Sequence, residues 1–216
     1  MTTDQLLEVY RAAQAARGQR PSAQRLARVR EKLDDGVLVV DDDLRGFALG
    51  EQGRTEDGAG EDVPGLLHLS MVFVHPDHQR RGVGAALVEA LADAAWGQGF
   101  REVSVWSTTP EFYEACGLQR TGRTQQLPAG TAVQLTAELE APLREVVVRD
   151  SSIRLGQLLK LAELVDSGSE AKELLASGAV DVNGEPELRR GRQLHDGDEV
   201  RARDQAVRVV LSPAGA

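Results

Sequence analysis

A polar turn with two glycines joins a buried strand to a helix, and this segment is well suited to holding an anion. The strand ends near Val74, the turn follows over residues 75–81, and Gly82 and Gly84 open an amphipathic helix. Because glycine has no side chain, several backbone N–H groups at the helix start can point toward one anion, which the helix dipole also attracts. Spacing alone leaves two interpretations, a phosphate cradle or a tight strand-to-helix connection.

The wider string around this turn favours the cradle. Residues 74–87 read Val-x-Pro-x-x-Gln-x-x-Gly-Val-Gly-x-x-Leu, which resembles the acetyl-CoA motif of the GNAT N-acetyltransferases, and the order of expected elements is similar over about residues 3–139. The resemblance implies acetyl-CoA as cosubstrate, with its pyrophosphate on the turn and its pantetheine arm along the strand. The coenzyme-binding residues that it implies are Met71, Val72, Phe73, Val74, Gln79, Arg80, Arg81, Gly82, Val83, Gly84, Ala85 and Ala86.

Acetyl transfer to an amine needs a base for the ammonium proton and a proton for the leaving thiolate. Residues 112–118 are similar to the family's Phe-Tyr-x-x-x-Gly-Phe segment, in which the tyrosine stands near the coenzyme sulfur, so Tyr113 is the general-acid candidate. Its alternative role is packing under the helix. His68 is the candidate base, and the alternative is an interior histidine bonded to a backbone carbonyl. Three further residues stay open as the base or its relay: Ser70, Glu111 and Glu114.

Two features depart from the family pattern. The usual first strand is missing before the opening helices, and the asparagine often found after the following strand is absent from residues 107–110. Four scattered histidines and one cysteine give no metal-ligand spacing and no internal disulfide, so no metal is expected. The departures keep a noncatalytic, acyl-CoA-sensing or scaffolding domain open as the alternative.

The last third of the chain carries a second set of spaced motifs. They read Ile-Arg-Leu-Gly-Gln-Leu-Leu-Lys-Leu, Val-Asp-Ser-Gly-Ser-Glu-Ala-Lys and Gly-Ala-Val-Asp-Val-Asn-Gly within residues 153–184, and an Arg-Arg-Gly-Arg segment follows. Over about residues 146–211 this resembles the S4 RNA-binding domain. Hydroxyls, helix N–H groups and basic side chains there can surround a phosphate backbone; the alternative is that each charge is a solvated face. The candidate RNA-binding residues are Lys160, Ser167, Ser169, Lys172, Arg189, Arg190 and Arg192.

Positioning these groups requires an ordered set of elements. Apolar spacing and turn residues predict helices and strands of a mixed α/β (α+β) fold, followed by a second, small α+β domain. The two resemblances imply a GNAT-like mixed sheet flanked by helices for the first domain and the S4 (alpha-L) type for the second. We expect a domain at 1–140, a linker at 141–145 and a second domain at 146–212. The expected elements are two opening helices, strands 37–40 and 45–50, a mobile loop 51–64, strand 66–74, helix 83–96, strand 103–106, helix 110–115, closing strands within 118–139, helices from 155 and 169, and short strands near 180–182, 200 and 207–209.

Composition sets the outer limits. The chain has 216 residues, 41% apolar and 27% charged, with a net charge of -9. This acidity argues against a protein that coats nucleic acid nonspecifically, although three arginines cluster after residue 188. The longest apolar run, 66–74, is far below the roughly 20 residues of a membrane span, so a cytoplasmic protein is expected.

The sequence therefore predicts an acetyl-CoA-dependent N-acetyltransferase whose amine acceptor is presented by structured RNA, such as rRNA, tRNA or a ribonucleoprotein. Recognition by RNA shape is favoured because the second domain has no aromatic residue on which a base could stack. Two alternatives remain. One is the noncatalytic RNA-binding protein, and the other is a small-amine acetyltransferase with an incidental RNA module. The acceptor, the particular RNA and the oligomeric state are not encoded in any motif.

Overall fold

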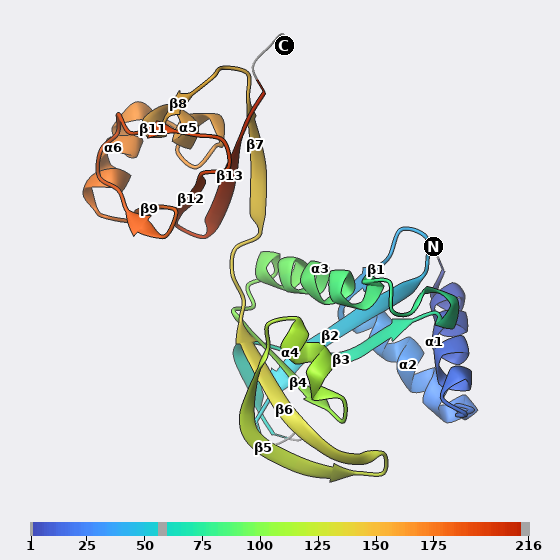
Figure 1. Ribbon diagram of the computed structural model, residues 1–216. Helices are drawn as coiled ribbons and strands as arrows, with labels where there is room; N and C mark the ends of the chain where they lie inside the picture. Colours follow the sequence, from blue (N-terminus) through green and yellow to red (C-terminus); the bar gives the residue numbers. More distant parts are fainter. Residues whose placement is uncertain (1, 56–59, 213–216) are drawn as a thin grey trace. The chain divides into compact units, whose positions relative to one another are not determined.

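The structure is a computed structural model that describes residues 2–55 and 60–212. The chain divides into two compact units, Met1–Glu140 and Ala141–Ala216 (Figure 1). The elements of the first unit are α1 (Thr3–Ala16), α2 (Ala23–Asp35), β1 (Val37–Val40), β2 (Gly46–Arg54), β3 (Asp62–Val74), the 3-10 helix η2 (Pro76–His78), α3 (Val83–Gly97), β4 (Glu102–Ser107), α4 (Pro110–Ala115), β5 (Gln119–Leu127) and β6 (Gly130–Glu138).

The first unit is a mixed sheet with helices on both faces, as the sequence predicts. Its strand order is β1-β2-β3-β4-β6-β5, and β3 and β4 form a parallel pair among antiparallel neighbours. The helix α3 packs on one face around Leu67, Leu91 and Leu135, whereas α1 and α2 pack on the other around Tyr10 and Phe47 (Figure 1). Apolar side chains spaced three and four residues apart give each helix the stripe that it buries.

One extra residue in β3 changes which way its side chains face. Leu49 of β2 pairs with Met71, but the next residue, Gly50, pairs with Leu69, so Ser70 forms a bulge. Leu69 consequently packs with α3, whereas Met71 packs with α1 and α2. A bulge also bends its strand and increases the local twist.

The prediction of a mobile loop over residues 51–64 is wrong at both ends of that segment. Strand β2 continues to Arg54 and β3 begins at Asp62, and these two residues are cross-strand partners joined by an ion pair of 3.0 Å. The Gln52 side chain donates a hydrogen bond of 2.6 Å to the Val63 carbonyl. The polar residues that indicated a loop therefore bond to each other across the strands. Residues 56–59 of the predicted loop lie outside the described residues.

The second unit joins two short helices to a small sheet. Its strand order is β10-β9-β12-β13-β7, with β7 parallel to β13, and residues 143–145 of the predicted linker belong to β7. In the ranges that the structure describes, neither unit has a helix long and apolar enough to cross a membrane. The elements are β7 (Leu143–Val148), β8 (Ile153–Arg154), α5 (Leu155–Leu161), α6 (Gly168–Ala176), β9 (Val180–Val182), β10 (Glu185–Pro186), β11 (Gln193–Leu194), β12 (Glu199–Ala202) and β13 (Gln205–Leu211).

Tyr10 has a buried hydroxyl whose effect on the free energy of unfolding can be measured. The residue is 1% exposed and its ring packs edge-on against Phe73 at 4.8 Å, but its hydroxyl has no hydrogen-bond partner among the described residues. Tyr10→Phe keeps the ring and removes the unpaired polar atom, so it should leave the free energy of unfolding unchanged or raise it by about 1 kcal/mol. Denaturant unfolding measures this; a loss above about 1 kcal/mol would show that the hydroxyl is bonded. Tyr10→Leu, which also removes the ring pair, should be destabilising.

Candidate functional site

The site forms where β3 leaves its parallel neighbour. Strand β3 pairs with β4 from Leu66 to His68 only, and it then continues to Val74 paired with β2 alone. The His75 N–H donates to the Arg45 carbonyl at 2.7 Å, on the β2 side. Because successive backbone groups of a strand alternate in direction, the N–H and carbonyl of Val72 point the other way, into the gap beside β4. The gap thus offers backbone donors and acceptors to an extended ligand.

The start of α3 lies at the far end of the same strand. Gly82 is the N-cap in the left-handed conformation, with φ of 82°, and no side chain caps the helix. Helix geometry leaves the N–H groups of Val83, Gly84 and Ala85 without intrahelical partners. Gly82 and Ala85 are exposed. This arrangement can hold a phosphate by N–H donation and by the helix dipole.

The two glycines of the turn serve different purposes. A Cβ placed on Gly82 would meet no atom within 4 Å, so this glycine is required by its backbone conformation. A Cβ on Gly84 would lie 3.2 Å and 3.3 Å from two ring carbons of Phe112, so this glycine lets α4 approach α3 closely. Gly82 therefore borders open space, whereas Gly84 borders the Phe112 ring.

The polar residues of the turn divide between anchoring and exposure. The Gln79 side chain donates a hydrogen bond of 3.1 Å to the Val74 carbonyl and so ties the turn to the end of β3. Arg80 has a left-handed φ of 59°, and both it and Arg81 are exposed. The two guanidinium groups add positive charge beside the uncapped helix start.

Tyr113 packs against the core, as its alternative role requires, and keeps the protonated hydroxyl that the predicted donor role requires. It is half-buried against the α3-side core, and its ring contacts Phe112 edge-on at 4.9 Å between centroids. Burial raises the pKa of its hydroxyl to about 12, although the charge of Arg17 lowers this pKa slightly. The hydroxyl therefore stays protonated, as a hydrogen-bond donor, throughout the neutral range.

His68 lies on the opposite face of the sheet from Tyr113. It is the cross-strand partner of Glu51, and its Nδ1 is 3.5 Å from the hydroxyl of Ser104 rather than bonded to the predicted carbonyl. Burial lowers the pKa of the imidazole below 6.5; Glu51 raises it and Lys32 lowers it further, and these two residues form an ion pair with each other. His68 is therefore neutral at pH 7, as a base must be.

The other candidate bases are already engaged. Both carboxylate oxygens of Glu114 accept from Arg120, at 2.7 Å and 3.1 Å, and this pairing holds the pKa of Glu114 below its usual range. Glu111 lies 3.5 Å from the same guanidinium. The Ser70 hydroxyl donates to the Leu49 carbonyl at 3.4 Å in the bulge. Over residues 2–55 and 60–212, no three His, Cys, Asp or Glu side chains gather as metal ligands would.

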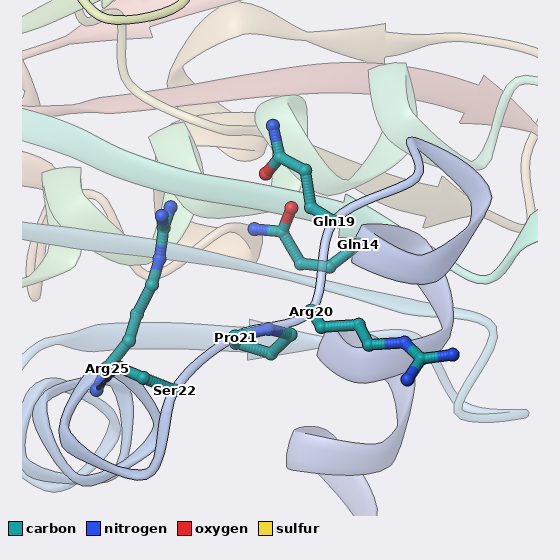
Figure 2. Close-up of a pocket in the computed structure, with 6 residues that line it drawn as sticks. All are labelled: Gln14, Gln19, Arg20, Pro21, Ser22 and Arg25. Atoms are coloured by element: carbon teal, nitrogen blue, oxygen red, sulfur yellow. Dashed lines mark hydrogen bonds between the residues drawn. The ribbon is translucent and has the colours of Figure 1, made fainter.

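A pocket that the sequence did not predict lies at the turn between α1 and α2. Its volume is about 260 Å³, and Figure 2 shows Gln14, Gln19 and Arg25 extending toward one side of the turn while Arg20 extends away. Gln14 is 3% exposed, and its Oε1 has no hydrogen-bond partner among the residues described. The one available signal was an amide on the apolar face of α1. The lining residues are Gln14, Gln19, Arg20, Pro21, Ser22 and Arg25.

In the second unit, one of the two predicted serines, Ser167, caps a helix. The Ser167 hydroxyl accepts from the Glu170 N–H at 3.2 Å as the N-cap of α6, and it lies 2.9 Å from the Ser169 hydroxyl. Lys160 and Lys172 are exposed on α5 and α6. Ser167 thus has a structural role already, and the lysines present their charge to solvent.

The predicted arginines belong to a segment, residues 187–192, that we call the arginine loop. Glu187 in this loop is 4% exposed and forms ion pairs with Arg189 at 2.8 Å and with Arg192 at 3.1 Å. Arg190 instead crosses Gly156, where a Cβ would lie 2.5 Å from the arginine Cγ. Sequence reasoning missed Glu187, because an acidic residue among arginines is typical of a solvated surface.

Comparison with known proteins matches each unit to a family model. Residues 33–120 match the acetyltransferase (GNAT) domain, and residues 146–210 match the S4 domain. The chain is 54% identical over 48 residues to the probable ribosome maturation protein RlbA of Bacillus subtilis, covering 22% of this chain and 68% of that protein. It is 39% identical over 57 residues to the glucosamine 6-phosphate N-acetyltransferase of Schizosaccharomyces pombe, covering 26% of this chain and about half, 51%, of that protein.

Among solved structures, the ribosomal-protein-S18-alanine N-acetyltransferase of Escherichia coli is 17% identical, with a TM-score of 0.47 and coverage of 66% of this chain and 92% of that one. An aminoglycoside 6'-N-acetyltransferase complexed with coenzyme A is 16% identical, with a TM-score of 0.49 and coverage of 65% and 92%.

Two glycines of α3 provide a matched test of the turn. Gly82 and Gly97 both have open space where a Cβ would stand, but of the two only Gly82 has a positive φ. Gly82→Ala should lower the free energy of unfolding by about 1–2 kcal/mol because a left-handed alanine is strained. Gly97→Ala should raise it by up to about 1 kcal/mol through helix propensity. Denaturant titration of both variants measures the difference, and equal effects would show that the turn does not hold Gly82 left-handed.

Proposed function

The chain belongs to the S4 domain family, and its first unit is a GNAT N-acetyltransferase domain with acetyl-CoA as cosubstrate. From this premise we propose that the protein acetylates an amine presented by structured RNA or a ribonucleoprotein. The observation that carries the proposal is the presence, in one chain, of the gap beside β3 and of the exposed arginine loop. The name of the Bacillus relative, a probable ribosome maturation protein, supports a ribosomal RNA or ribosomal particle as the context.

The first unit fits the coenzyme at both of its ends. The N–H groups after Gly82 and the exposed Arg80 and Arg81 would hold the pyrophosphate. The backbone of Met71, Val72, Phe73 and Val74 lines the gap, and the groups of Val72 that point into it would pair with the amides of the pantetheine arm. When bound, acetyl-CoA supplies the acetyl group as a thioester.

The acid and base candidates would act from opposite faces of the sheet. His68, neutral at pH 7, would accept the proton of the attacking amine, directly or through water. Tyr113 would donate to the leaving sulfur, where a pKa of about 12 makes it a hydrogen-bond donor more than a full proton source. In this proposal the thioester would lie in the gap between β3 and β4, where groups from both faces of the sheet would act on it.

The acceptor would approach from the turn between α1 and α2. Arg17, at the C-cap of α1, lies 5.8 Å from the centre of the Phe73 ring, which links this turn to β3. The neighbouring pocket is lined by Gln14, whose buried Oε1 has no hydrogen-bond partner among the described residues. Arg25 also lines that pocket, so an acceptor with negative charge near its amine suits it.

A noncatalytic role is the second candidate, favoured by the high pKa of Tyr113 and by the missing asparagine in residues 107–110. In that case the gap would bind acyl-CoA without turnover, and the second unit would bind RNA. Measurement of thioester turnover distinguishes the two candidates, because binding alone releases no free thiol.

The pH dependence of turnover tests His68 as the base. Only the neutral imidazole accepts a proton, so the rate advantage of the natural chain over His68→Gln should be constant near neutral pH. The advantage should shrink as the pH falls through the lowered pKa of His68, below 6.5. Both chains are assayed with one acceptor at saturating acetyl-CoA, so the titration of the acceptor cancels in the ratio. A ratio that stays independent of pH from neutrality down to the acid unfolding of the chain would contradict the role.

The function itself is tested with purified ribosomal particles and labelled acetyl-CoA. Transfer of label should require the natural chain, and Tyr113→Phe should lower the rate about 10²–10⁴-fold with little change in coenzyme affinity. A triple variant, Lys160→Ala with Lys172→Ala and Arg190→Ala, should lower RNA affinity and reduce labelling in parallel. The slope of log affinity against log salt concentration should become less steep by about 0.7 for each phosphate that is no longer bound. The triple variant leaves Arg189 and Arg192 paired with Glu187.

The matched control is Arg149→Ala, which removes an exposed basic residue of the same unit outside the predicted set. It should leave RNA affinity and labelling close to those of the natural chain. Thiol release with free amines at the same rate with and without RNA would support the small-amine acetyltransferase instead. Coenzyme and RNA binding without label transfer or thiol release would support the noncatalytic protein.

A further inference from the structure

We propose that Glu187 is a positioning residue that presets Arg189 and Arg192 for contact with RNA phosphates; this inference rests on the RNA-binding role proposed above. Both carboxylate oxygens are used. Oε1 accepts from the backbone N–H and the Nε of Arg189 at 2.8 Å and 3.0 Å. Oε2 accepts from Nη2 of Arg189 at 2.8 Å and from Nη1 of Arg192 at 3.1 Å.

Hydrogen bonds between backbone groups hold both ends of the arginine loop. The Glu187 N–H donates to the Val180 carbonyl at 2.9 Å, next to the β9–β10 hairpin. The carbonyls of Arg190 and Arg192 accept from the N–H groups of Gly156 and Leu155, at 3.0 Å and 2.8 Å, at the start of α5. Since backbone bonds already hold both ends of the loop, the carboxylate adds one bond to the main chain, at the Arg189 N–H, and otherwise acts on the arginine side chains.

The pairing leaves the arginines able to bind a second anion. The Arg189 side chain is 77% exposed, whereas that of Glu187 is 5% exposed, so the carboxylate holds one edge of the guanidinium and the rest meets solvent. A guanidinium has five N–H donors, of which Glu187 uses two on Arg189 and one on Arg192. The three arginines of the loop still exceed its one glutamate by two positive charges.

Holding the arginine side chains in place before RNA binds lowers the free-energy cost of ordering them. Immobilising a long side chain at an interface costs about 0.5–1.5 kcal/mol, and a guanidinium already held in place loses less freedom when a phosphate binds. Electrostatics alone predicts the opposite effect of the carboxylate, because removing a negative charge from an RNA-binding loop should tighten binding. The sign of the change on neutralising Glu187 therefore separates positioning from simple charge.

The test uses the full chain and a fluorescein-labelled RNA hairpin of mixed sequence, titrated at several salt concentrations. Glu187→Gln should weaken binding about 5- to 20-fold and flatten the salt slope, although it removes a negative charge. Glu185→Gln is the matched control, since it neutralises an exposed carboxylate two residues earlier. It should leave binding unchanged or tighten it slightly. Val182→Ala, in the buried core, should lower thermal stability without changing affinity well below its melting temperature.

A second variant and an NMR measurement test the inference even if Glu187→Gln does not fold properly. Arg189→Lys keeps the positive charge but cannot form the bidentate pair, so it should also weaken binding. In NMR spectra without RNA, the Nε–Hε group of Arg189 should exchange slowly with water in the natural chain and rapidly in Glu187→Gln.

Two outcomes overturn the inference while leaving RNA binding intact. One is a Glu187→Gln chain that binds the hairpin as tightly as the natural chain or more tightly. The other is equal Hε exchange of Arg189 with and without the Glu187 carboxylate. A natural chain that binds neither the hairpin nor purified ribosomal RNA would instead overturn the proposed RNA-binding role, and the inference with it.

Discussion

The divided pairing of β3 is the constraint on which the first unit depends. This strand must keep β2 along its length, yet it stays with β4 for only three residues, and the extra residue Ser70 lies just beyond the point of separation. The bulge places Leu69 in the α3-side core and Met71 in the core of α1 and α2. One strand thereby fills both cores and still leaves backbone groups unpaired beside β4. Restoring regular alternation would turn one of these apolar sets toward the wrong face of the sheet.

Burial prepares the two reactive candidates in a complementary way. It lowers the pKa of His68 and raises that of Tyr113, so both side chains are uncharged at neutral pH. A neutral base and a protonated donor can therefore coexist across the gap without a charge that would need a partner. In the second unit, by contrast, the buried group is charged: the Glu187 carboxylate forms ion pairs with Arg189 and Arg192.

The sequence predicted the parts of the site that local patterns encode. The glycine spacing and apolar stripe located α3 and its uncapped start, and the aromatic segment located Tyr113. The bulge at Ser70 was not predictable, because a one-residue change of register depends on which side chains two cores accept and leaves no mark in local composition. The pairing of Arg54 with Asp62 was missed because acidic and glycine residues favour a loop until the partner strand is known. Glu187 was missed because burial of a charge depends on tertiary structure.

The gap beside β3 should receive an extended ligand through alternate backbone groups, and amide hydrogen exchange at single-residue resolution tests this role. On addition of acetyl-CoA, exchange of the Val72 amide, which points into the gap, should slow markedly, together with that of the amides after Gly82. Exchange of the Phe73 amide should change little, because it already faces β2. Saturating acetyl-CoA that leaves Val72 unchanged, or that slows Val72 and Phe73 equally, would show that the ligand does not pair with the strand in this way.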